Sequence, residues 1–417
     1  MNMKNSAERK RLAIVGFGGR GHIYGEFARR YPEKFQLVAV AETDPDRRKD
    51  AEDNFGAKVY ADYREMLSSG EKFDLVAIAT QDRQHKEHAL YALERGYDLL
   101  LEKPVAVTEG DCLDIYRSAE RNGRKVYVCH VLRYTPFYSA IRRLIDEDVP
   151  GEIVNIHASE NVGYYHQAHS YVRGPWRNSV ESSPMILAKC CHDMDILRYL
   201  IGEKCVSVNS YGSLSYFRKE NAPEGSTQFC SDCPRSEECI YNAQKLYTRY
   251  IWPAGYFTKG ELTEQNILRD LKYSPYDRCV YRCDNDVVDH QSTVLLFEKG
   301  KTAVHTMTAF SGEIYRDIKI YGTKAEIVGV MEDNFLEVRP LGGKAYRVDV
   351  NSEASVGGHC GGDYYMMLQI WNAMNGRPCE GITYLDVSLE SHLMAFCAEK
   401  SRLSGGSTQF VRLREGE

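Results

Sequence analysis

No run of about eighteen or more apolar residues occurs in this 417-residue chain, so the sequence predicts no transmembrane helix. The N-terminal segment is polar and lacks the apolar stretch that a secretion signal needs, so we expect a cytoplasmic protein. The chain also lacks internal repeats and low-complexity segments. Its net charge of −6 gives no basis for binding nucleic acid or an anionic membrane.

The composition is that of an ordinary globular protein. With 43% hydrophobic and 27% charged residues, a chain of this length can bury two separate hydrophobic cores. It contains 13 cysteines. In a reducing compartment, cysteines serve as free thiols or metal ligands and do not build a disulfide framework.

A dinucleotide-binding fingerprint lies near the start of the chain. An apolar strand at residues 11–15 runs into Gly16, Gly18 and Gly21, and a helix is predicted to follow. In this motif the glycines allow a tight turn and a close approach to a pyrophosphate, while the helix N-terminus faces the phosphates. The second strand, at residues 36–41, ends in Glu42, whose carboxylate favours ribose hydroxyls over a 2′-phosphate. The sequence therefore predicts NAD rather than NADP as the cofactor.

Strands and helices alternate through the first third of the chain, which is the pattern of a doubly wound parallel sheet. We predict an α/β protein with a Rossmann domain at residues 1–135. An α+β substrate domain is expected at residues 136–417, with a large, open, mostly antiparallel sheet. A cysteine-rich insertion of irregular structure interrupts this domain at about residues 222–283. Strands of the second sheet are predicted at residues 153–160, 206–214, 292–297, 302–309 and 318–321.

Further motifs keep the order and spacing of one known family. Glu102-Lys-Pro104 ends the fifth predicted strand, and His192-Asp-Met-Asp195 follows later on a helix. Together with the glycine turn, residues 80–85 and the segment Arg133-Tyr-x-Pro136, they resemble the Gfo/Idh/MocA oxidoreductases. The resemblance covers residues 11 to about 330. It implies an NAD(P)-dependent dehydrogenase, of a family that acts mostly on sugars and cyclitols.

The resemblance assigns chemistry to two residues. Lys103 follows a parallel strand at the edge where such sheets bind ligands, and it would polarise a substrate hydroxyl or relay its proton. His192 would act as general base, because a neutral imidazole accepts the proton that hydride transfer leaves on the hydroxyl. The alternatives are a solvated surface lysine and a buried core histidine.

One position departs from the common family pattern. Many members carry an aspartate four residues before the histidine, whereas this chain has Ala188 there, followed by Lys189. Lys189 would bind a sugar hydroxyl or stabilise an alkoxide in place of the acid. The alternative is a solvated helix residue.

The remaining candidates line the expected cleft. Cofactor contacts are expected at the glycine turn and the acid that follows it, from Gly16, Gly18, Gly19, Arg20, Gly21 and Glu42. The resemblance implies further cofactor contacts from Thr80, His85, Glu102, Lys103 and Arg133. Substrate contacts are expected from Tyr134, His169, Trp176, Arg177 and Asp195. The aromatic and polar loop residues among them suit sugar recognition and an oligomer interface equally well. We also expect a homo-oligomer, either a dimer or a tetramer.

The insertion carries five cysteines, at Cys230, Cys233, Cys239, Cys279 and Cys283. A Cys-x-x-Cys pair presents two thiolates at the spacing of a tetrahedral zinc site. We expect a structural Zn²⁺ held by Cys230, Cys233, Cys239 and Cys283, with Cys279 as an alternative fourth ligand. An iron–sulfur cluster and a set of reduced, partly buried thiols are the competing interpretations.

These features together predict an NAD-dependent dehydrogenase that takes a hydride from a hydroxyl carbon of a sugar, cyclitol or glycoside. An alternative begins with the same step: oxidation at C3 of a glycoside acidifies the neighbouring C–H, so elimination, water addition and re-reduction would make a glycosidase. His290, His305, His359 or a tyrosine would then supply a second base. A noncatalytic sensor of NAD or sugar is a further alternative, against which the presence of Lys103 and His192 argues.

Overall fold

Apolar segments of the first third of the chain form a parallel six-stranded sheet in the computed structural model, which describes residues 8–350 and 359–412. The strand order is β3-β2-β1-β4-β5-β6, and it reverses between β1 and β4, so a crevice for a dinucleotide opens at the carboxyl ends of these two strands. The strands are β1 (Lys10–Val15), β2 (Phe35–Ala41), β3 (Lys58–Tyr60), β4 (Leu75–Ile78), β5 (Leu99–Leu101) and β6 (Val126–Val128).

Helices cover both faces of this sheet. Alternate residues of β1 belong to two different hydrophobic clusters, Leu12 and Ile14 to one and Ala13 and Val15 to the other, as expected for a strand buried on both sides. The helices are α1 (Gly19–Arg30), α2 (Pro45–Phe55), α3 (Tyr63–Leu67), α4 (His85–Glu94) and α5 (Glu109–Asn122), with the short turns η1 (Asp82–Gln84) and η2 (Val131–Tyr134). The doubly wound fold predicted from the sequence is confirmed.

The second domain is built on a nine-stranded sheet of order β14-β13-β12-β11-β7-β10-β9-β8-β15. Among the described strands, every neighbouring pair except β7 and β10 is antiparallel, so the prediction of a large, mostly antiparallel sheet is also confirmed. The strands are β7 (Ile153–Asn161), β8 (Cys205–Ser213), β9 (His290–Phe297), β10 (Thr302–Thr308), β11 (Tyr315–Gly322), β12 (Ala325–Val330), β13 (Phe335–Pro340), β14 (Tyr346–Arg347) and β15 (Gln409–Phe410). The last four in chain order were not predicted.

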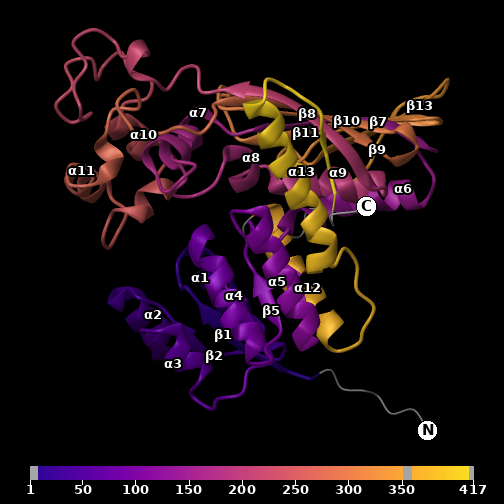
Figure 1. The fold of residues 1–417 in the computed structure, drawn as a ribbon. Coiled ribbons are helices and arrows are strands. Elements are labelled where there is room, and N and C mark those ends of the chain that lie inside the picture. The colour runs from indigo at the N-terminus through magenta and orange to yellow at the C-terminus, as the bar shows by residue number, and fades with distance from the viewer. Residues whose placement is uncertain (1–7, 351–358, 413–417) are drawn as a thin grey trace.

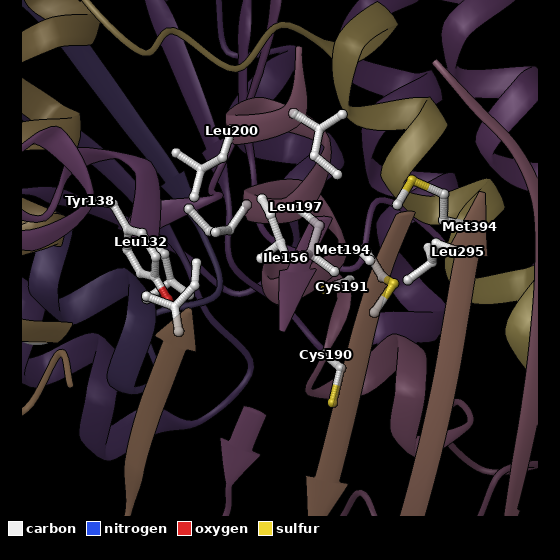
Figure 2. Close-up of a cluster of buried hydrophobic side chains, with 14 of the residues drawn as sticks. Leu132, Tyr138, Ile156, Cys190, Cys191, Met194, Leu197, Leu200, Leu295 and Met394 are labelled. Carbon is white, nitrogen blue, oxygen red and sulfur yellow. The ribbon is translucent and has the colours of Figure 1, made fainter. Parts of the chain in front are cut away.

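One face of this sheet packs against helices, and alternate residues of β9 face away from them and are exposed. Figure 2 shows Ile156 and Leu295 of the sheet in one buried cluster with Met194 and Leu197 of α9. The helices of this domain are α6 (Pro136–Asp146), α7 (Tyr164–His166), α8 (Met185–Ala188) and α9 (Cys191–Ile201), and the segment η3 (Gln167–Arg173) follows α7. This core holds α9, the helix that carries His192, against the sheet.

The last two helices connect the domains. α12 (Gly362–Met374) follows the turn η8 (His359–Gly361) and packs Met366 and Ile370 into a core cluster of the parallel sheet. α13 (Leu385–Leu403) lies against α5 of the first domain and against α9 and β8 of the second (Figure 1). The boundary predicted at residue 135 therefore leaves out α12, which packs as part of the first domain although it comes late in the chain.

The insertion is more regular than the sequence suggested. It contains α10 (Ala243–Arg249) and α11 (Glu264–Leu271), the turns η5 (Trp252–Tyr256) and η6 (Pro275–Asp277), and one hydrophobic cluster of its own, and it shares a second cluster with α7 and η3. The turns η4 (Lys219–Asn221) and η7 (Glu298–Gly300) lie just outside it. Lys259 of the insertion lies 3.9 Å from Asp46 at the start of α2, so the insertion reaches the first domain.

None of the helices within residues 8–350 and 359–412 has the length and apolarity that a membrane crossing requires.

Gly21→Ala is expected to destabilise the first domain, because a Cβ at this position would lie 2.1 Å from the carbonyl oxygen of Gly16. We expect the free energy of unfolding to fall by about 1–3 kcal/mol, as for other overpacked sites. Gly19→Ala is the matched control, since a Cβ there meets nothing within 4 Å. Urea unfolding of the cofactor-free protein measures both variants. A Gly21→Ala protein as stable as the wild type would show that helix and strand are not closely packed here.

Candidate active site

The glycine turn has the geometry that a dinucleotide requires. Gly16 has a φ of +86° and packs against the backbone of Ala79, just after β4, where a Cβ would clash. α1 begins at Gly19, so its first N–H groups lie at the crevice between β1 and β4. Both features fit a pyrophosphate bound at this turn.

Glu42 lies against the same turn. Its buried carboxylate accepts hydrogen bonds from the backbone N–H of Phe17 (2.7 Å) and of Asp44 (3.0 Å). Arg47 of α2 lies close by, with its guanidinium 3.4 Å from the place of a Cβ on Gly18. Arg47 was not predicted as a site residue. Its only signal in the sequence is its place in the first turn of the helix that follows Glu42.

An ion-pair network joins α1 to the end of β5. Arg20 lies 2.5 Å from the carboxylate of Glu102 and 2.6 Å from that of Asp363 on α12, and Tyr24 also donates to Glu102. Burial opposes ionisation of Glu102, but Arg20 and Tyr24 outweigh it and hold the pKa of this carboxyl below its usual value. The network therefore fixes the backbone just before Lys103.

Lys103 and His192 approach one another from the two domains. The Nζ of Lys103 donates a hydrogen bond to the carbonyl oxygen of Ala188 at the end of α8 (2.8 Å). His192 lies in the first turn of α9, and its buried Nδ1 has no hydrogen-bond partner among the described residues. Burial, and then the charge of Lys103, lowers the pKa of His192 well below its ordinary value. The imidazole is therefore uncharged at neutral pH and able to accept a proton.

His192 belongs to a row of histidines. Its ring centroid lies 6.1 Å from that of His359 and 5.7 Å from that of His130, which lies 5.5 Å from that of His392 on α13. Burial lowers the pKa of His130 to about 4 and that of His392 to about 3. His359 is exposed and lies 3.0 Å from Asp363. The row therefore runs from the interior through His192 to the surface.

Lys189 belongs to a network of buried charges. Its Nζ lies 3.2 Å from Glu160, a fully buried carboxylate at the end of β7. Arg316 of β11 pairs with the same carboxylate and lies 3.0 Å from Asp193 of α9. The side chain of Lys189 is only 14% exposed, so the interpretation as a solvated helix residue does not hold. Its role in binding a hydroxyl stays a prediction.

Arg133, Tyr134 and Asp195 have different partners from those expected. Nε and Nη2 of Arg133 each lie 2.6 Å from an oxygen of Asp195, and both residues are buried. The hydroxyl of Tyr134 is bonded to the backbone and side chain of Thr383. A buried charge needs a charged partner, and here the two candidates satisfy each other. All three thus lie between the domains with partners inside the protein, and their roles in binding the cofactor and the substrate stay predictions.

Thr80 and His85 tie two strand ends together. The ring nitrogens of His85 lie 2.7 Å from the carbonyl oxygen of Pro104 and 3.1 Å from that of Thr80. The hydroxyl of Thr80 contacts His88 (3.0 Å). His85 is buried and engaged on both sides, and its contact with the cofactor stays a prediction.

The loop after η3 places Trp176 at the carboxyl edge of the parallel sheet. Its indole N–H lies 3.4 Å from a carboxylate oxygen of Asp82, which also accepts hydrogen bonds from Ser182 and Ser183. Asp82 was not predicted as a site residue, because a lone aspartate after a strand carries no signal of its own. His166 was not predicted as a site residue either. Burial, and then the charge of Lys189, lowers the pKa of His166 well below its ordinary value.

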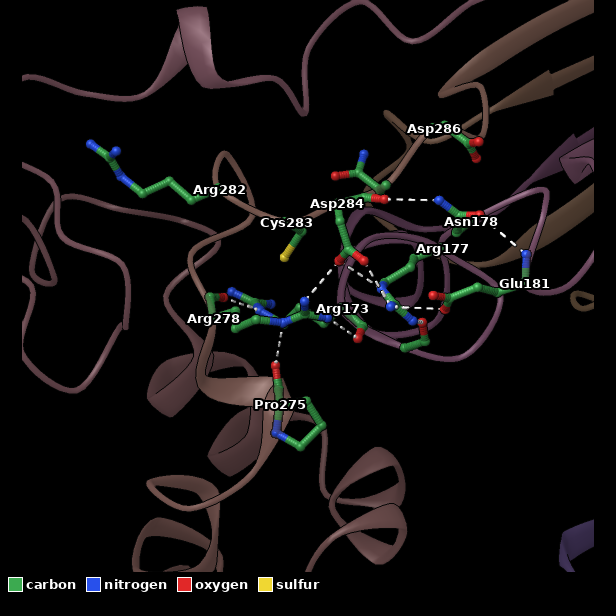
Figure 3. A network of polar contacts seen from close by, with 12 residues as sticks. Arg173, Arg177, Asn178, Glu181, Pro275, Arg278, Arg282, Cys283, Asp284 and Asp286 are labelled. Carbon is green, nitrogen blue, oxygen red and sulfur yellow. Dashed lines mark hydrogen bonds and ion pairs between the residues drawn. The ribbon is translucent and has the colours of Figure 1, made fainter.

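Two other loop candidates have partners in or beside the insertion. Figure 3 shows Arg177 held by Asp284 and Glu181, at 2.8 and 2.9 Å. His169 stacks on Tyr276 with ring centroids 4.7 Å apart. Both side chains thus attach the loop to neighbouring segments, and their roles in binding the substrate stay predictions.

Two family models match this chain. One, described as an oxidoreductase family with an NAD-binding Rossmann fold, matches residues 10–130, and the Gfo/Idh/MocA C-terminal domain matches residues 138–328. Together they cover more than half of the chain, which therefore belongs to the Gfo/Idh/MocA oxidoreductase family.

Individual relatives are distant. The putative oxidoreductase YteT of Bacillus subtilis (strain 168) is 23% identical over 370 residues, which are 82% of this chain and 83% of that protein. Inositol 2-dehydrogenase 2 of Saccharopolyspora erythraea is 29% identical over 203 residues, which are 48% of this chain and 56% of that protein. This match therefore spans about half of each of the two proteins. The solved structure of levoglucosan dehydrogenase with NADH and levoglucosan has a TM-score of 0.71 at 17% identity and covers 97% of this chain and 100% of that one. At this identity the likeness shows the shared fold.

Glu42→Arg is expected to move the cofactor preference from NAD toward NADP. In the wild type the carboxylate would face the 2′-phosphate, so NAD should bind more tightly by roughly 1–3 kcal/mol, about 5-fold to 150-fold. Fluorescence titration with NADH and NADPH measures both affinities. Glu42→Gln is the control that keeps the shape and removes the charge, and it should lose discrimination while it still binds NADH. Equal affinity of the wild type for the two cofactors would contradict the assignment.

The free energy of unfolding is expected to fall as the pH drops below about 6.5. The unfolded chain takes up protons at the ordinary histidine pKa of about 6.5, whereas buried His130 and His392 resist protonation until about 4 and 3. The free energy of unfolding therefore falls as the pH drops from about 6.5 toward the folded pKa of each histidine. The loss is about 1.4 kcal/mol per pH unit for each of the two histidines. Urea unfolding between about pH 7 and 5 measures the slope.

His392→Gln should make this pH slope shallower by about one proton, since one of the buried histidines that resist protonation is gone. His157→Gln, on an exposed position of β7, is the control and should leave the slope unchanged. A His392→Gln slope equal to that of the wild type would show that this histidine is not held neutral.

Proposed function

We propose that this oxidoreductase uses NAD to remove a hydride from a hydroxyl-bearing carbon of a sugar, cyclitol or glycoside. The observation that carries the proposal is the approach of Lys103 and His192 from the two domains at the carboxyl edge of the parallel sheet. The glycine turn with Glu42 at the same edge fits NAD. The substrate class is supported by the likeness to inositol 2-dehydrogenase and to levoglucosan dehydrogenase.

His192 and Lys103 act differently on the substrate hydroxyl. His192 takes the proton, since its imidazole is neutral at physiological pH. Lys103 stabilises the negative charge that develops on the oxygen, and its bond to Ala188 holds the ammonium in place beforehand. When bound at the glycine turn, NAD accepts the hydride on its nicotinamide ring.

Other charged residues support this arrangement. Lys189 binds a further hydroxyl of the substrate, and Glu160 and Arg316 hold it in place. His359 lies at the surface end of the histidine row and carries the proton from His192 to solvent. The cysteines of the insertion take no part in this chemistry, because the proton and hydride steps are complete without them. Any metal that they bind is structural.

A redox-neutral glycosidase is the second candidate, and the place of His359 favours it. Elimination after oxidation at C3 needs a second base, and His359 is an exposed histidine whose ring centroid lies 6.1 Å from that of His192. His290 instead pairs with Asp289 on the sheet (2.8 Å), and His305 is buried beside Asp193 (3.9 Å). If NAD is reduced without release of the aglycone, the protein is a dehydrogenase; if the aglycone is released without net reduction, it is a glycosidase.

Lys103→Ala and His192→Ala are each expected to lower kcat by about two to four orders of magnitude, the usual effect of removing a positioned acid or base. NADH binding should survive, because neither side chain contacts the glycine turn. The substrate is found first with a panel of sugars, cyclitols and glycosides, by following NADH absorbance and analysing the products.

His157→Ala is the control for these variants, since it removes an exposed histidine of β7 from the second domain. It should keep wild-type turnover. Near-wild-type turnover of Lys103→Ala or His192→Ala on the same substrate would remove that residue from the mechanism.

A further inference from the structure

The insertion is not organised around the ligands predicted for zinc. Among the residues that the structure describes, the ligand-type atoms that lie within 4.8 Å of one another belong to Cys190, Asp193 and His305, outside the insertion. No three sulfurs of the insertion therefore lie at ligand spacing. The structure does not bring together the predicted zinc ligands Cys230, Cys233, Cys239 and Cys283. The contacts of the insertion with the first domain indicate a different role for it.

The segment that includes η5 reaches the helix that follows Glu42. The ammonium of Lys259 lies 3.9 Å from Asp46 at the start of α2. Lys259 also acts on Asp44, the N-cap residue of α2: the pKa of this carboxyl is lowered by hydrogen bonds from the backbone of α2 and then by the charges of Arg47 and Lys259. Figure 1 shows α10 and α11 on the same side of the molecule as α1 and α2. The insertion therefore lies against the part of the first domain that carries the glycine turn.

Tyr256, the last residue of η5, lies near the glycine turn itself. It is 53% exposed, and burial raises the pKa of its hydroxyl while the charges of Arg47 and Arg20 oppose this shift. Arg20 belongs to the first turn of α1, and the guanidinium of Arg47 lies beside Gly18. Within residues 8–350 and 359–412, no carboxylate lies within 4.0 Å of the guanidinium of Arg47. A cation without an ion pair and a half-exposed phenol thus lie together at the turn.

A row of rings continues from Tyr256 along the second domain. Successive ring centroids are between 5.1 and 6.4 Å apart. The rings are, in order, those of Tyr256, His169, Trp252, His166, Tyr171 and Trp176. At the far end the indole N–H of Trp176 lies 3.4 Å from Asp82. The two rings that the insertion supplies are about half exposed, Trp252 at 47% and Tyr256 at 53%.

This row follows the direction in which a dinucleotide lies. Asp82 comes after β4 and Arg47 comes after β2, and the sheet order places β1, with its glycine turn, between these two strands. A dinucleotide lies across the carboxyl ends of such strands, with its pyrophosphate at the turn. The row therefore borders the cleft from the side of the second domain. Its exposed rings, Trp252 and Tyr256, belong to the half that lies nearer to Arg47.

We propose that the insertion completes the NAD site, with Tyr256 and Trp252 covering the pyrophosphate and adenosine half of the dinucleotide. Arg47 pairs with the pyrophosphate, and Lys259 holds the insertion against α2. The phenol donates a hydrogen bond to the anion, and the indole offers it an apolar face. Half-exposed aromatic rings also occur at protein interfaces, but a neighbouring cation without an ion pair favours an anionic ligand. The inference rests on NAD as the cofactor and not on the identity of the substrate.

Hydrogen–deuterium exchange of the wild-type protein tests this site without any variant. Saturating NADH should slow the exchange of backbone amides at residues 251–259 as well as at the glycine turn. α11, in the same insertion, should exchange at an unchanged rate. Protection of the glycine turn alone would overturn the proposal. Protection of neither segment would instead contradict NAD as the cofactor, so the two failures are distinguishable.

Matched variants test the individual side chains. Tyr256→Ala and Trp252→Ala should each raise the Kd of NADH by about 5- to 30-fold, as for the loss of one good contact, and should speed its release in stopped flow. Tyr256→Phe keeps the ring and should have a smaller effect. Tyr273→Ala is the control, since it removes an aromatic residue of the same insertion that is 86% exposed, and it should keep the wild-type Kd. A wild-type Kd in both Tyr256→Ala and Trp252→Ala, or an equal loss in Tyr273→Ala, would overturn the proposal.

Discussion

The buried ion pair between Arg133 and Asp195 fixes α9 against the end of the first domain. Asp195 and His192 are three residues apart on α9 and so lie on the same side of this helix. The ion pair therefore also sets where His192 lies relative to Lys103, which contacts the preceding helix through Ala188. Removing one partner of such a pair typically costs about 3–5 kcal/mol, because the other charge is left buried and alone. The two halves of the candidate site are thus held in register by charges that do not themselves react.

Similar pairs surround the reacting groups on both sides. Arg20 joins Glu102 and Asp363 on the cofactor side, and Glu160 joins Lys189 and Arg316 on the substrate side. Between them the ammonium of Lys103 lies near uncharged imidazoles. This distribution suits an alcohol that passes through an alkoxide: a fixed positive charge faces the oxygen, and a neutral base takes the proton.

The sequence predicted the features that depend on residues close to one another in the chain. Buried strands give continuous apolar runs, and the glycine turn, Lys103 and His192 lie at fixed offsets from strand or helix ends. It could not predict partners that are far apart in the chain, such as Arg133 with Asp195 or Lys189 with Glu160. Strands β14 and β15 have two residues each and are too short to show a period. Composition alone could not predict the partners of His169 and Arg177, since aromatic and polar side chains suit a sugar site and a packed loop equally.

The central claim is that hydride leaves the hydroxyl-bearing carbon and travels directly to NAD. Its most direct test uses the first substrate that reduces NAD, deuterated at the oxidised carbon, followed by NMR of the NADH that is formed. The arrangement of Lys103, His192 and the glycine turn predicts deuterium at C4 of the nicotinamide ring. Solvent hydrogen at that position would contradict direct hydride transfer.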